Sequence, residues 1–233
     1  MKVIAIIPAG GGGKRALQSI PKQFVKFDGK ELIAYTLDVF QKSPLIDGIV
    51  IAAGKKYFKL LKNIKKQYKF FKIIKIVEGG KERQDSVYNA LTSVKLNKTD
   101  LVVVHDAARP LLPAQILKKA ILTAKKKGNA LVCIKSRDTL IKANKFVEGY
   151  INRNKVHYVQ TPQVFRYSDL LYSMELAYGK NFIGTDESML AKRAGFKINL
   201  VEGSILNFKI TTANDVRIFK KLAKFFFKID NIA

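Results

Sequence analysis

Three stretches of the sequence combine open backbone with charged side chains, and each follows a run of strand-forming residues. The first is "PAGGGGKR" at 8–15, which is followed by Pro21-Lys22. Glycines after a strand leave backbone N–H groups open to an anion. Guanidinium and ammonium groups are the side chains that bind phosphate. This stretch therefore predicts a site for a nucleoside triphosphate.

Two other nucleotide-binding patterns fit the same stretch poorly. A Walker A loop would need glycine in place of Pro8 and serine or threonine in place of Arg15. A dinucleotide fingerprint can be forced onto the glycines, but the second strand ends in "IAAG" (51–54), without a carboxylate for a ribose. A dinucleotide-dependent oxidoreductase remains an alternative, which a titration with NADH would test.

The second stretch, "EGGKERQDSV" at 78–87, follows a strand and opens a helix. Gly79 and Gly80 supply open backbone, and Ser86 supplies a hydroxyl. Open α/β sheets bind ligands at the carboxyl ends of their strands. The alternative is structural, because Asp85 and Ser86 are also residue types that the helix dipole favours in a first turn.

The third stretch is "VVVHDAARP" at 102–110, where Asp106 comes directly after a buried strand. A carboxylate at that edge of the sheet is hard to explain by packing, and next to a triphosphate it would bind Mg²⁺, which prefers oxygen ligands. Ala107 leaves room, and Arg109 adds a phosphate-binding guanidinium. Asp106 could instead cap a helix, but the prolines at 110 and 113 favour a loop.

These stretches resemble a known family. "PAGGGGKR…PKQF", "HDAARP" and "NRNKVHYVQTPQVF" are similar to the motifs of sugar- and polyol-phosphate nucleotidyltransferases, most closely the 2-C-methyl-D-erythritol 4-phosphate cytidylyltransferase family. The resemblance runs from about residue 3 to about residue 217 with the motifs in family order. It implies an enzyme of the non-mevalonate isoprenoid pathway that transfers the cytidylyl group of CTP to 2-C-methyl-D-erythritol 4-phosphate and releases pyrophosphate. The nearest alternative is ribitol 5-phosphate cytidylyltransferase, which shares the loop, the arm and the chemistry.

The resemblance also implies roles for particular residues. The catalytic residues would be Arg15 and Lys22. The nucleotide-binding residues would be Pro8, Ala9, Gly10, Gly11, Gly12, Gly13, Arg15, Lys22, Gly80, Lys81, Arg83, Ser86, Asp106 and Ala107. The residues that bind the acceptor would be Arg109, Thr139, Arg153, Thr161 and Lys209, and the metal, Mg²⁺ or another divalent cation, would bind Asp106. The family sometimes has an acidic residue at Lys81, so only a backbone contact is expected there.

The proposed chemistry needs no strong base, because the acceptor phosphate already carries a nucleophilic oxygen. The difficulty is to bring two polyanions together in line at the α-phosphorus. Arg15 and Lys22 would face the charge that develops in the transition state. His105, on a strand, is expected to be a buried supporting residue rather than a base, and two histidines with one cysteine leave no zinc site.

Apolar runs alternate with amphipathic stretches, which predicts an α/β fold, Rossmann-like with a mostly parallel sheet, as one domain over 1–233. The expected strands are Val3–Ile7, Gly48–Ala52, Ile73–Val77, Leu101–His105 and Ala130–Ile134, all read as buried on both faces. The expected helices between them are Glu31–Lys42, Lys55–Gln67, Glu82–Val94 and Pro113–Lys126.

The alternation breaks at 136–160, which reads as an inserted β-arm with a turn at Asn144-Lys145. In the resembling family the arms of two subunits clasp each other, so a homodimer is expected, with some arm residues reaching the partner's site. After the arm we expect helices at 167–178 and 186–194, the second capped by Asp186. Strands at 197–201 and in "FKIT" (208–211) and a helix at 213–228 complete the chain.

Composition limits the alternatives. With 43 Lys and Arg against 18 Asp and Glu the net charge is +25, which could attract nucleic acid. No nucleic-acid-binding motif is present, and the lysines are spread over helix faces, so we interpret the excess as compositional bias. A basic nucleic-acid-binding protein remains the alternative from another class. No run is long enough for a membrane span, nothing reads as a signal peptide, and the lone Cys133 suits a reducing compartment, so a cytoplasmic protein is expected.

Overall fold

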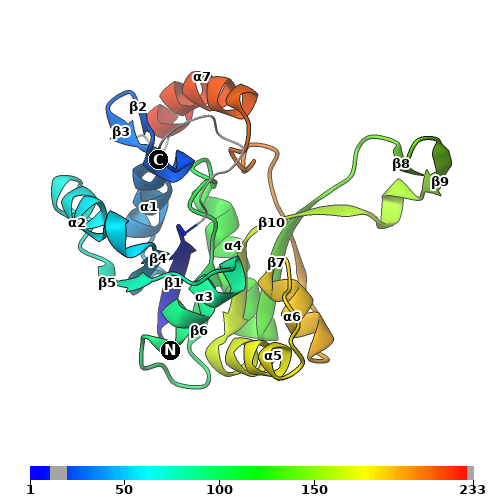
Figure 1. Ribbon diagram of the computed structural model, residues 1–233, viewed down its shortest axis with the longest axis horizontal. Coiled ribbons are helices and arrows are strands. Elements are labelled where there is room, and N and C mark those ends of the chain that lie inside the picture. Colours follow the sequence, from blue (N-terminus) through cyan, green and yellow to red (C-terminus); the bar gives the residue numbers. More distant parts are fainter. Residues whose placement is uncertain (11–19, 230–233) are drawn as a thin grey trace.

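The computed structural model describes residues 1–10 and 20–229 (Figure 1). Four predicted site residues, Gly11, Gly12, Gly13 and Arg15, lie outside the described residues. The fold is built on a seven-stranded sheet with the order β11-β7-β10-β6-β1-β4-β5. The strands are β1 Val3–Pro8, β4 Gly48–Ala53, β5 Ile73–Glu78, β6 Leu101–Val104, β7 Asn129–Lys135, β10 His157–Arg166 and β11 Leu200–Glu202.

The sheet is mostly parallel, which confirms the expected fold class. β1 pairs in parallel with β4 and β6, β4 with β5, and β7 with β11. β10 is the exception, because it runs antiparallel to both β6 and β7. The five expected strands all form, with bounds within one residue of those predicted.

Helices cover both faces of the sheet, and the residues of β1 show why. Val3, Ala5 and Ile7 pack into one cluster, with the helices α1 Leu32–Lys42, α2 Phe58–Gln67 and α4 Ala114–Lys127. Ile4 and Ile6 point to the opposite face, into a second cluster with α3 Arg83–Thr92, α5 Tyr167–Gly179 and α6 Glu187–Arg193. Successive side chains of a strand alternate between faces, so a continuous apolar run is the pattern of a strand that is covered twice.

A third apolar cluster joins the C-terminal helix to residues 27–35 and 108–111. The C-terminal helix α7 Ala213–Ile229 packs Phe219 edge-on against Phe27, with ring centroids 5.3 Å apart. Phe27 belongs to a small hairpin of β2 Lys26–Phe27 and β3 Lys30–Glu31 that the sequence analysis missed. Its turn is Asp28-Gly29, with φ of 48° and 79°, the dipeptide and the left-handed conformation of a tight hairpin turn.

Four other expectations, including the start of the helix expected from Lys55, differ from the structure. "FKIT" (208–211) forms no strand, because the amide groups of Thr211 and Thr212 donate to the carboxylate of Asp215 at the start of α7. The strand expected at 197–201 starts only at Leu200. β5 lies at the edge of the sheet and leaves Ile74 half exposed, so the expectation of burial on both faces is wrong there. A 3-10 turn, Lys55–Tyr57, precedes α2.

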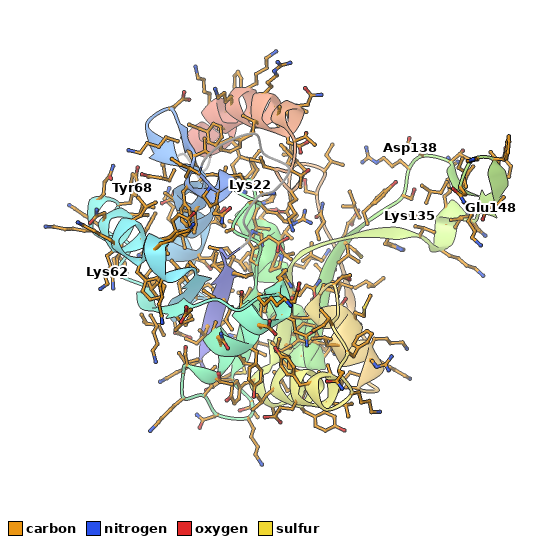
Figure 2. The ribbon with its side chains drawn as sticks, viewed as in Figure 1. Lys22, Lys62, Tyr68, Lys135, Asp138 and Glu148 are labelled. Carbon is orange, nitrogen blue, oxygen red and sulfur yellow. The ribbon has the colours of Figure 1, made fainter. Side chains whose placement is uncertain are left out.

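The arm projects from the sheet, as Figure 1 shows at the right. Its two strands are β8 Leu140–Ala143 and β9 Val147–Ile151, followed by the 3-10 turn Arg153–Lys155. The long strand β10 leads from the arm back into the centre of the sheet. In Figure 2, Asp138 and Glu148 on the arm lie far from Lys22 in the body of the molecule. Within the described residues, no helix has the length and apolar character needed to cross a bilayer.

Candidate active site

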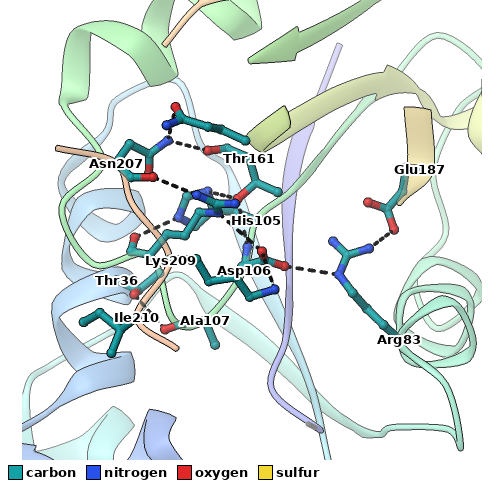
Figure 3. Close-up of polar contacts among 12 residues, drawn as sticks. Thr36, Arg83, His105, Asp106, Ala107, Thr161, Glu187, Asn207, Lys209 and Ile210 are labelled. Carbon is teal, nitrogen blue, oxygen red and sulfur yellow. Dashed lines mark hydrogen bonds and ion pairs between the residues drawn. The ribbon is translucent and has the colours of Figure 1, made fainter. Parts of the chain in front are cut away.

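Asp106 is the centre of a cluster of charge at the carboxyl end of β6 (Figure 3). Its Oδ1 lies 3.1 Å from Nε of Arg83, and its Oδ2 lies 3.0 Å from Nζ of Lys209 and 3.4 Å from Nε of Arg109. Burial alone would raise the pKa of the Asp106 carboxyl. The charges of Arg83, Lys209 and Arg109 outweigh burial and hold that pKa well below its usual range, so the group is ionised at neutral pH.

The three cations reach Asp106 from three different segments. Arg83 is the first residue of α3, Arg109 follows β6, and Lys209 lies in the segment before α7. The structure thus brings together four of the predicted site residues from distant parts of the sequence. Their predicted roles toward a nucleotide or an acceptor stay predictions.

Arg83 has a second carboxylate partner that the sequence analysis missed. Its Nη1 donates to Oε1 of Glu187, the first residue of α6, over 2.6 Å. Burial lowers the pKa of Arg83, but Glu187 and Asp106 outweigh it and raise the pKa above its ordinary value. The sequence placed 187 at a helix start but gave no signal that its side chain would turn inward.

His105 is buried and neutral, as expected of a supporting residue. Its pKa is lowered to about 4 because burial disfavours the charged ring. Thr161 Oγ1 accepts the N–H of Asp106 at 3.2 Å and lies 2.9 Å from Nδ1 of His105. Nε2 of His105 lies 3.0 Å from the carbonyl of Arg109, which can only accept, so Nε2 carries the ring proton and Nδ1 accepts from the Thr161 hydroxyl. The Thr161 hydroxyl therefore has both a donor and an acceptor partner within the protein.

The segment that carries Lys209 is fixed by buried polar contacts. The side chain of Asn207 donates from Nδ2 to the backbone carbonyl of Thr161 at 2.7 Å. The backbone carbonyl of Asn207 accepts from Nη1 of Arg109 at 2.8 Å. Gln160 donates to the carbonyl of Ser204 at 2.8 Å. The sequence analysis missed Asn207 and Gln160. An isolated amide side chain shows no sequence pattern that distinguishes a buried, hydrogen-bonded residue from a surface residue.

Lys22 reaches the same segment from the N-terminal side. Its Nζ donates to the carbonyl of Ile210 at 2.6 Å, and the N–H of Ile210 donates to the carbonyl of Ala108. Lys22 therefore contacts the residue that directly follows Lys209. The structure places the predicted catalytic lysine beside the Asp106 cluster.

Gly10 and Gly80, two of the predicted nucleotide-binding glycines, lie beside Ser86 together with Gly79. The N–H of Gly80 donates to Ser86 Oγ at 3.1 Å. A Cβ added at Gly79 would lie 3.0 Å from that oxygen, and one added at Gly10 would lie 3.4 Å from it. The ends of β1 and β5 and the start of α3 thus come within contact distance of one another.

The predicted structural alternative is confirmed for Asp85 in the same turn. Its Oδ2 accepts the N–H of Glu82, which completes a capping box at the start of α3. Two other predicted residues, Ala9 and Ala107, also have partners within the protein. The backbone carbonyl of Ala9 accepts from Gln23 Nε2 at 2.7 Å, and that of Ala107 accepts from Thr36 Oγ1 at 2.9 Å. Pro8 ends β1, and the side chain of Lys81 is exposed.

Two predicted acceptor residues lie on the arm rather than at the cluster. Thr139 precedes β8, and Arg153 follows β9 and donates from Nη1 to the carbonyl of Arg137 at 2.9 Å. Because the arm projects from the body (Figure 1), one chain does not bring these residues to its own Asp106. Asp186 takes the expected role and caps α6, accepting the N–H of Met189 at 2.8 Å.

A divalent cation fits the site only with ligands from its substrates. In the described part of the chain, no group of three or more His, Cys, Asp or Glu side chains could hold a metal. Asp106 is the carboxylate that three side-chain cations share. Mg²⁺ is commonly bound by one or two carboxylates together with substrate phosphates and water, a ligand set that suits a single carboxylate.

A Rossmann-like sheet with a projecting arm, and a cationic cluster at the ends of its strands, defines the class as a nucleotidyltransferase. The family described as IspD, 2-C-methyl-D-erythritol 4-phosphate cytidylyltransferase, matches residues 3–226. The chain belongs to this family.

Two relatives and two solved structures match this chain over nearly the whole length of both partners. The chain is 40% identical to the enzyme of Clostridium acetobutylicum, covering 94% of this chain and 96% of that one. It is 41% identical to the enzyme of Clostridioides difficile, covering 93% and 92%. The crystal structure from Francisella tularensis has a TM-score of 0.82 at 30% identity, covering 97% and 100%. The 4-diphosphocytidyl-2C-methyl-D-erythritol synthase from Anaerococcus prevotii has a TM-score of 0.83 at 26% identity, covering 96% of each chain.

Proposed function

We propose that this chain transfers the cytidylyl group of CTP to 2-C-methyl-D-erythritol 4-phosphate, giving 4-diphosphocytidyl-2-C-methyl-D-erythritol and pyrophosphate. The observation that carries this proposal is the family match over residues 3–226. Nothing in the comparisons favours ribitol 5-phosphate as the acceptor. The reaction is a step of the non-mevalonate isoprenoid pathway.

The chemistry is an in-line displacement at the α-phosphorus of CTP. An oxygen of the acceptor phosphate forms the new P–O bond, and the bond from the α-phosphorus to the bridging oxygen breaks as pyrophosphate leaves. Lys22 bears on the α-phosphate, while Lys209 and Arg109 attract the acceptor phosphate. The contact of Lys22 with the Ile210 carbonyl, next to Lys209, supports this assignment, since it brings the two ammonium-bearing residues together.

The divalent cation is assigned to Asp106. The ionised carboxylate of Asp106 would hold it, and the cation would neutralise charge on the triphosphate when bound. Arg83, Arg109 and Lys209 remain around the same carboxylate to bind and orient the phosphate groups. The chain's own contribution is to keep Asp106 ionised and fixed.

The arm is proposed to form a homodimer. Large apolar side chains on it are exposed, with Phe146 81% and Tyr150 77% accessible. Exposed apolar patches of this kind mark interaction surfaces. In such a dimer Thr139 and Arg153 would reach the partner's site. The single cysteine, Cys133, is buried, which agrees with the cytoplasm as the proposed compartment.

The test is a turnover assay of the whole chain. Purified protein is incubated with CTP, Mg²⁺ and either methylerythritol phosphate or ribitol 5-phosphate, and released pyrophosphate is counted. We expect turnover with methylerythritol phosphate, its loss with EDTA and its return with added Mg²⁺. Faster turnover with ribitol 5-phosphate would reject the acceptor assignment. Absence of turnover together with tight, salt-dependent binding of duplex DNA would favour the nucleic-acid alternative.

A further inference from the structure

Glu187 is a buried carboxylate to which the proposed reaction gives no task. It is the first residue of α6, and only 1% of its side chain is exposed. Its Oε1 accepts from Arg83 Nη1 at 2.6 Å, whereas Oε2 has no hydrogen-bond partner in the described part of the chain. Burying a carboxylate is costly unless it is paired. A helix start alone does not account for a side chain turned inward.

Arg83 spans two carboxylates that lie on opposite sides of it (Figure 3). Its Nε lies against Asp106 and its Nη1 against Glu187, while Nη2 is buried without a hydrogen-bond partner among the described residues. Asp106 is shared with Lys209 and Arg109, so its charge is divided among three cations. Within the described residues Glu187 forms an ion pair with Arg83 alone.

The backbone of Glu187 is fixed on both sides. Asp186 caps α6 through the N–H of Met189, and the N–H of Ser188 donates to Oε1 of Gln163 on β10 at 2.8 Å. The carboxylate therefore comes from a rigid helix start anchored to the central sheet. Because its backbone is held in place, Glu187 can fix the position of the Arg83 guanidinium.

We propose that Glu187 is a positioning residue that holds Arg83 toward the nucleotide and neutralises it when Asp106 engages its substrates. Phosphate or a cation at the cluster competes for Asp106, and an arginine held by Asp106 alone would then turn or lose its counter-charge. Glu187 keeps the guanidinium in place throughout the binding of CTP. The inference rests on the proposed role of Arg83 in nucleotide binding.

The test is Glu187→Gln, which keeps the shape of the side chain and removes its charge. We expect KM for CTP to rise about tenfold, with kcat and KM for the acceptor within about twofold of wild type. Glu187→Asp restores the charge on a shorter side chain and should recover part of the affinity for CTP. The matched control is Glu175→Gln, an exposed glutamate on α5, which should change neither constant.

An unchanged KM for CTP in folded Glu187→Gln would overturn the inference. If thermal unfolding shows that Glu187→Gln does not fold, KM for CTP of folded Glu187→Ala, which also removes the charge, decides in the same way. Arg83→Lys separates this inference from the proposed site. If Arg83→Lys leaves KM for CTP unchanged, the nucleotide role of Arg83 is wrong; if it raises KM while Glu187→Gln does not, only the role of Glu187 is wrong. In the double variant the two effects should combine to less than their sum.

Discussion

The ionised side chains at the candidate site carry a net positive charge, and they are partly buried. Arg83, Arg109 and Lys209 surround Asp106, and Arg83 also pairs with Glu187. Charge of one sign in a cleft attracts ions of the other sign, and both proposed substrates are phosphates. The carboxylates keep the cations ordered before the substrates arrive. In the proposed function these charges would reduce the repulsion between the two anionic substrates.

The Lys22→Ala variant tests this interpretation at the reacting phosphorus. Loss of a cation that faces developing charge is expected to lower kcat by about 100-fold or more, with a smaller change in KM for CTP. Steady-state pyrophosphate release measures both constants. Lys62→Ala, an exposed lysine on α2 that lies away from Lys22 in Figure 2, is the matched control and should behave as wild type. A folded Lys22→Ala protein with normal kcat would remove Lys22 from the mechanism.

His105 makes stability depend on pH. Its pKa is about 4 in the folded protein because it is buried, and the ordinary value of 6.5 applies in the unfolded chain. The unfolded chain therefore binds more protons, so stability is fully present above pH 6.5 and falls as the pH drops toward 4. The loss attributable to His105 is on the order of 3 kcal/mol.

Urea denaturation between pH 7 and pH 4 measures this loss. Asp100, Asp106 and Asp215 also have lowered pKa values, but most of their stabilisation is lost below their ordinary value of 3.8, outside that window. His105→Asn removes the ring, so its unfolding free energy should vary less with pH between 6.5 and 4. An equal slope in the wild type and in His105→Asn would show that His105 titrates normally.

Elements meet at the site through their ends. The carboxyl ends of β1, β5 and β6 lie beside the N-termini of α3 and α6, the arrangement in which open α/β sheets bind their ligands. The turn between β5 and α3 is one of these junctions. Gly80 occupies it because a Cβ there would lie 2.1 Å from the Cβ of Asp85, which belongs to the capping box.

Gly80→Ala is therefore expected to break the capping box and to destabilise the fold by roughly 1–3 kcal/mol. The Cβ of Asp85 is fixed by the helix backbone, so the clash cannot be relieved by a side-chain rotation. Gly179→Ala at the end of α5, where nothing lies within 4 Å of the added Cβ, should change stability by less than about 1 kcal/mol. Urea denaturation compares the two, and equal unfolding free energies would contradict this account of the turn.

The whole molecule has a body that carries the charge cluster and an arm that carries two predicted acceptor residues. The arm extends beyond the body, so the proposed site is complete only if a second chain brings Arg153 to Asp106 (Figure 1). The exposed Phe146 and Tyr150 give the arm apolar surface to bury in such a contact. Assembly and catalysis are therefore linked in the proposal.

Coexpression of Lys22→Ala with Arg153→Ala tests this link. If Arg153 serves the partner's site, half of the dimers are mixed and one of their two sites carries both intact residues. Activity should then return to about a quarter of wild type, although each variant alone is nearly inactive. Sedimentation would establish that dimers are present. Mixed dimers that stay inactive would show that Arg153 does not act across the interface.

The sequence by itself determined the five apolar strands β1, β4, β5, β6 and β7, most helices and the place of Asp106 directly after β6. Apolar runs such as that of β1 are read locally, because the alternation of side chains is a property of the strand alone. Asp186 as a cap is local in the same way, since its acceptor and the N–H of Met189 are three residues apart.

Only the tertiary structure decided which distant residues meet. The Arg83–Glu187 pair joins residues 104 positions apart, and the contact of Asn207 with Thr161 spans 46. "FKIT" reads as a strand locally, yet its end is taken by the capping of α7. β10 enters the sheet antiparallel because the chain returns from the arm in the opposite direction. Hydrophobic periodicity reports which face of an element is buried, whereas these pairings depend on how the chain crosses between elements, which no local pattern records.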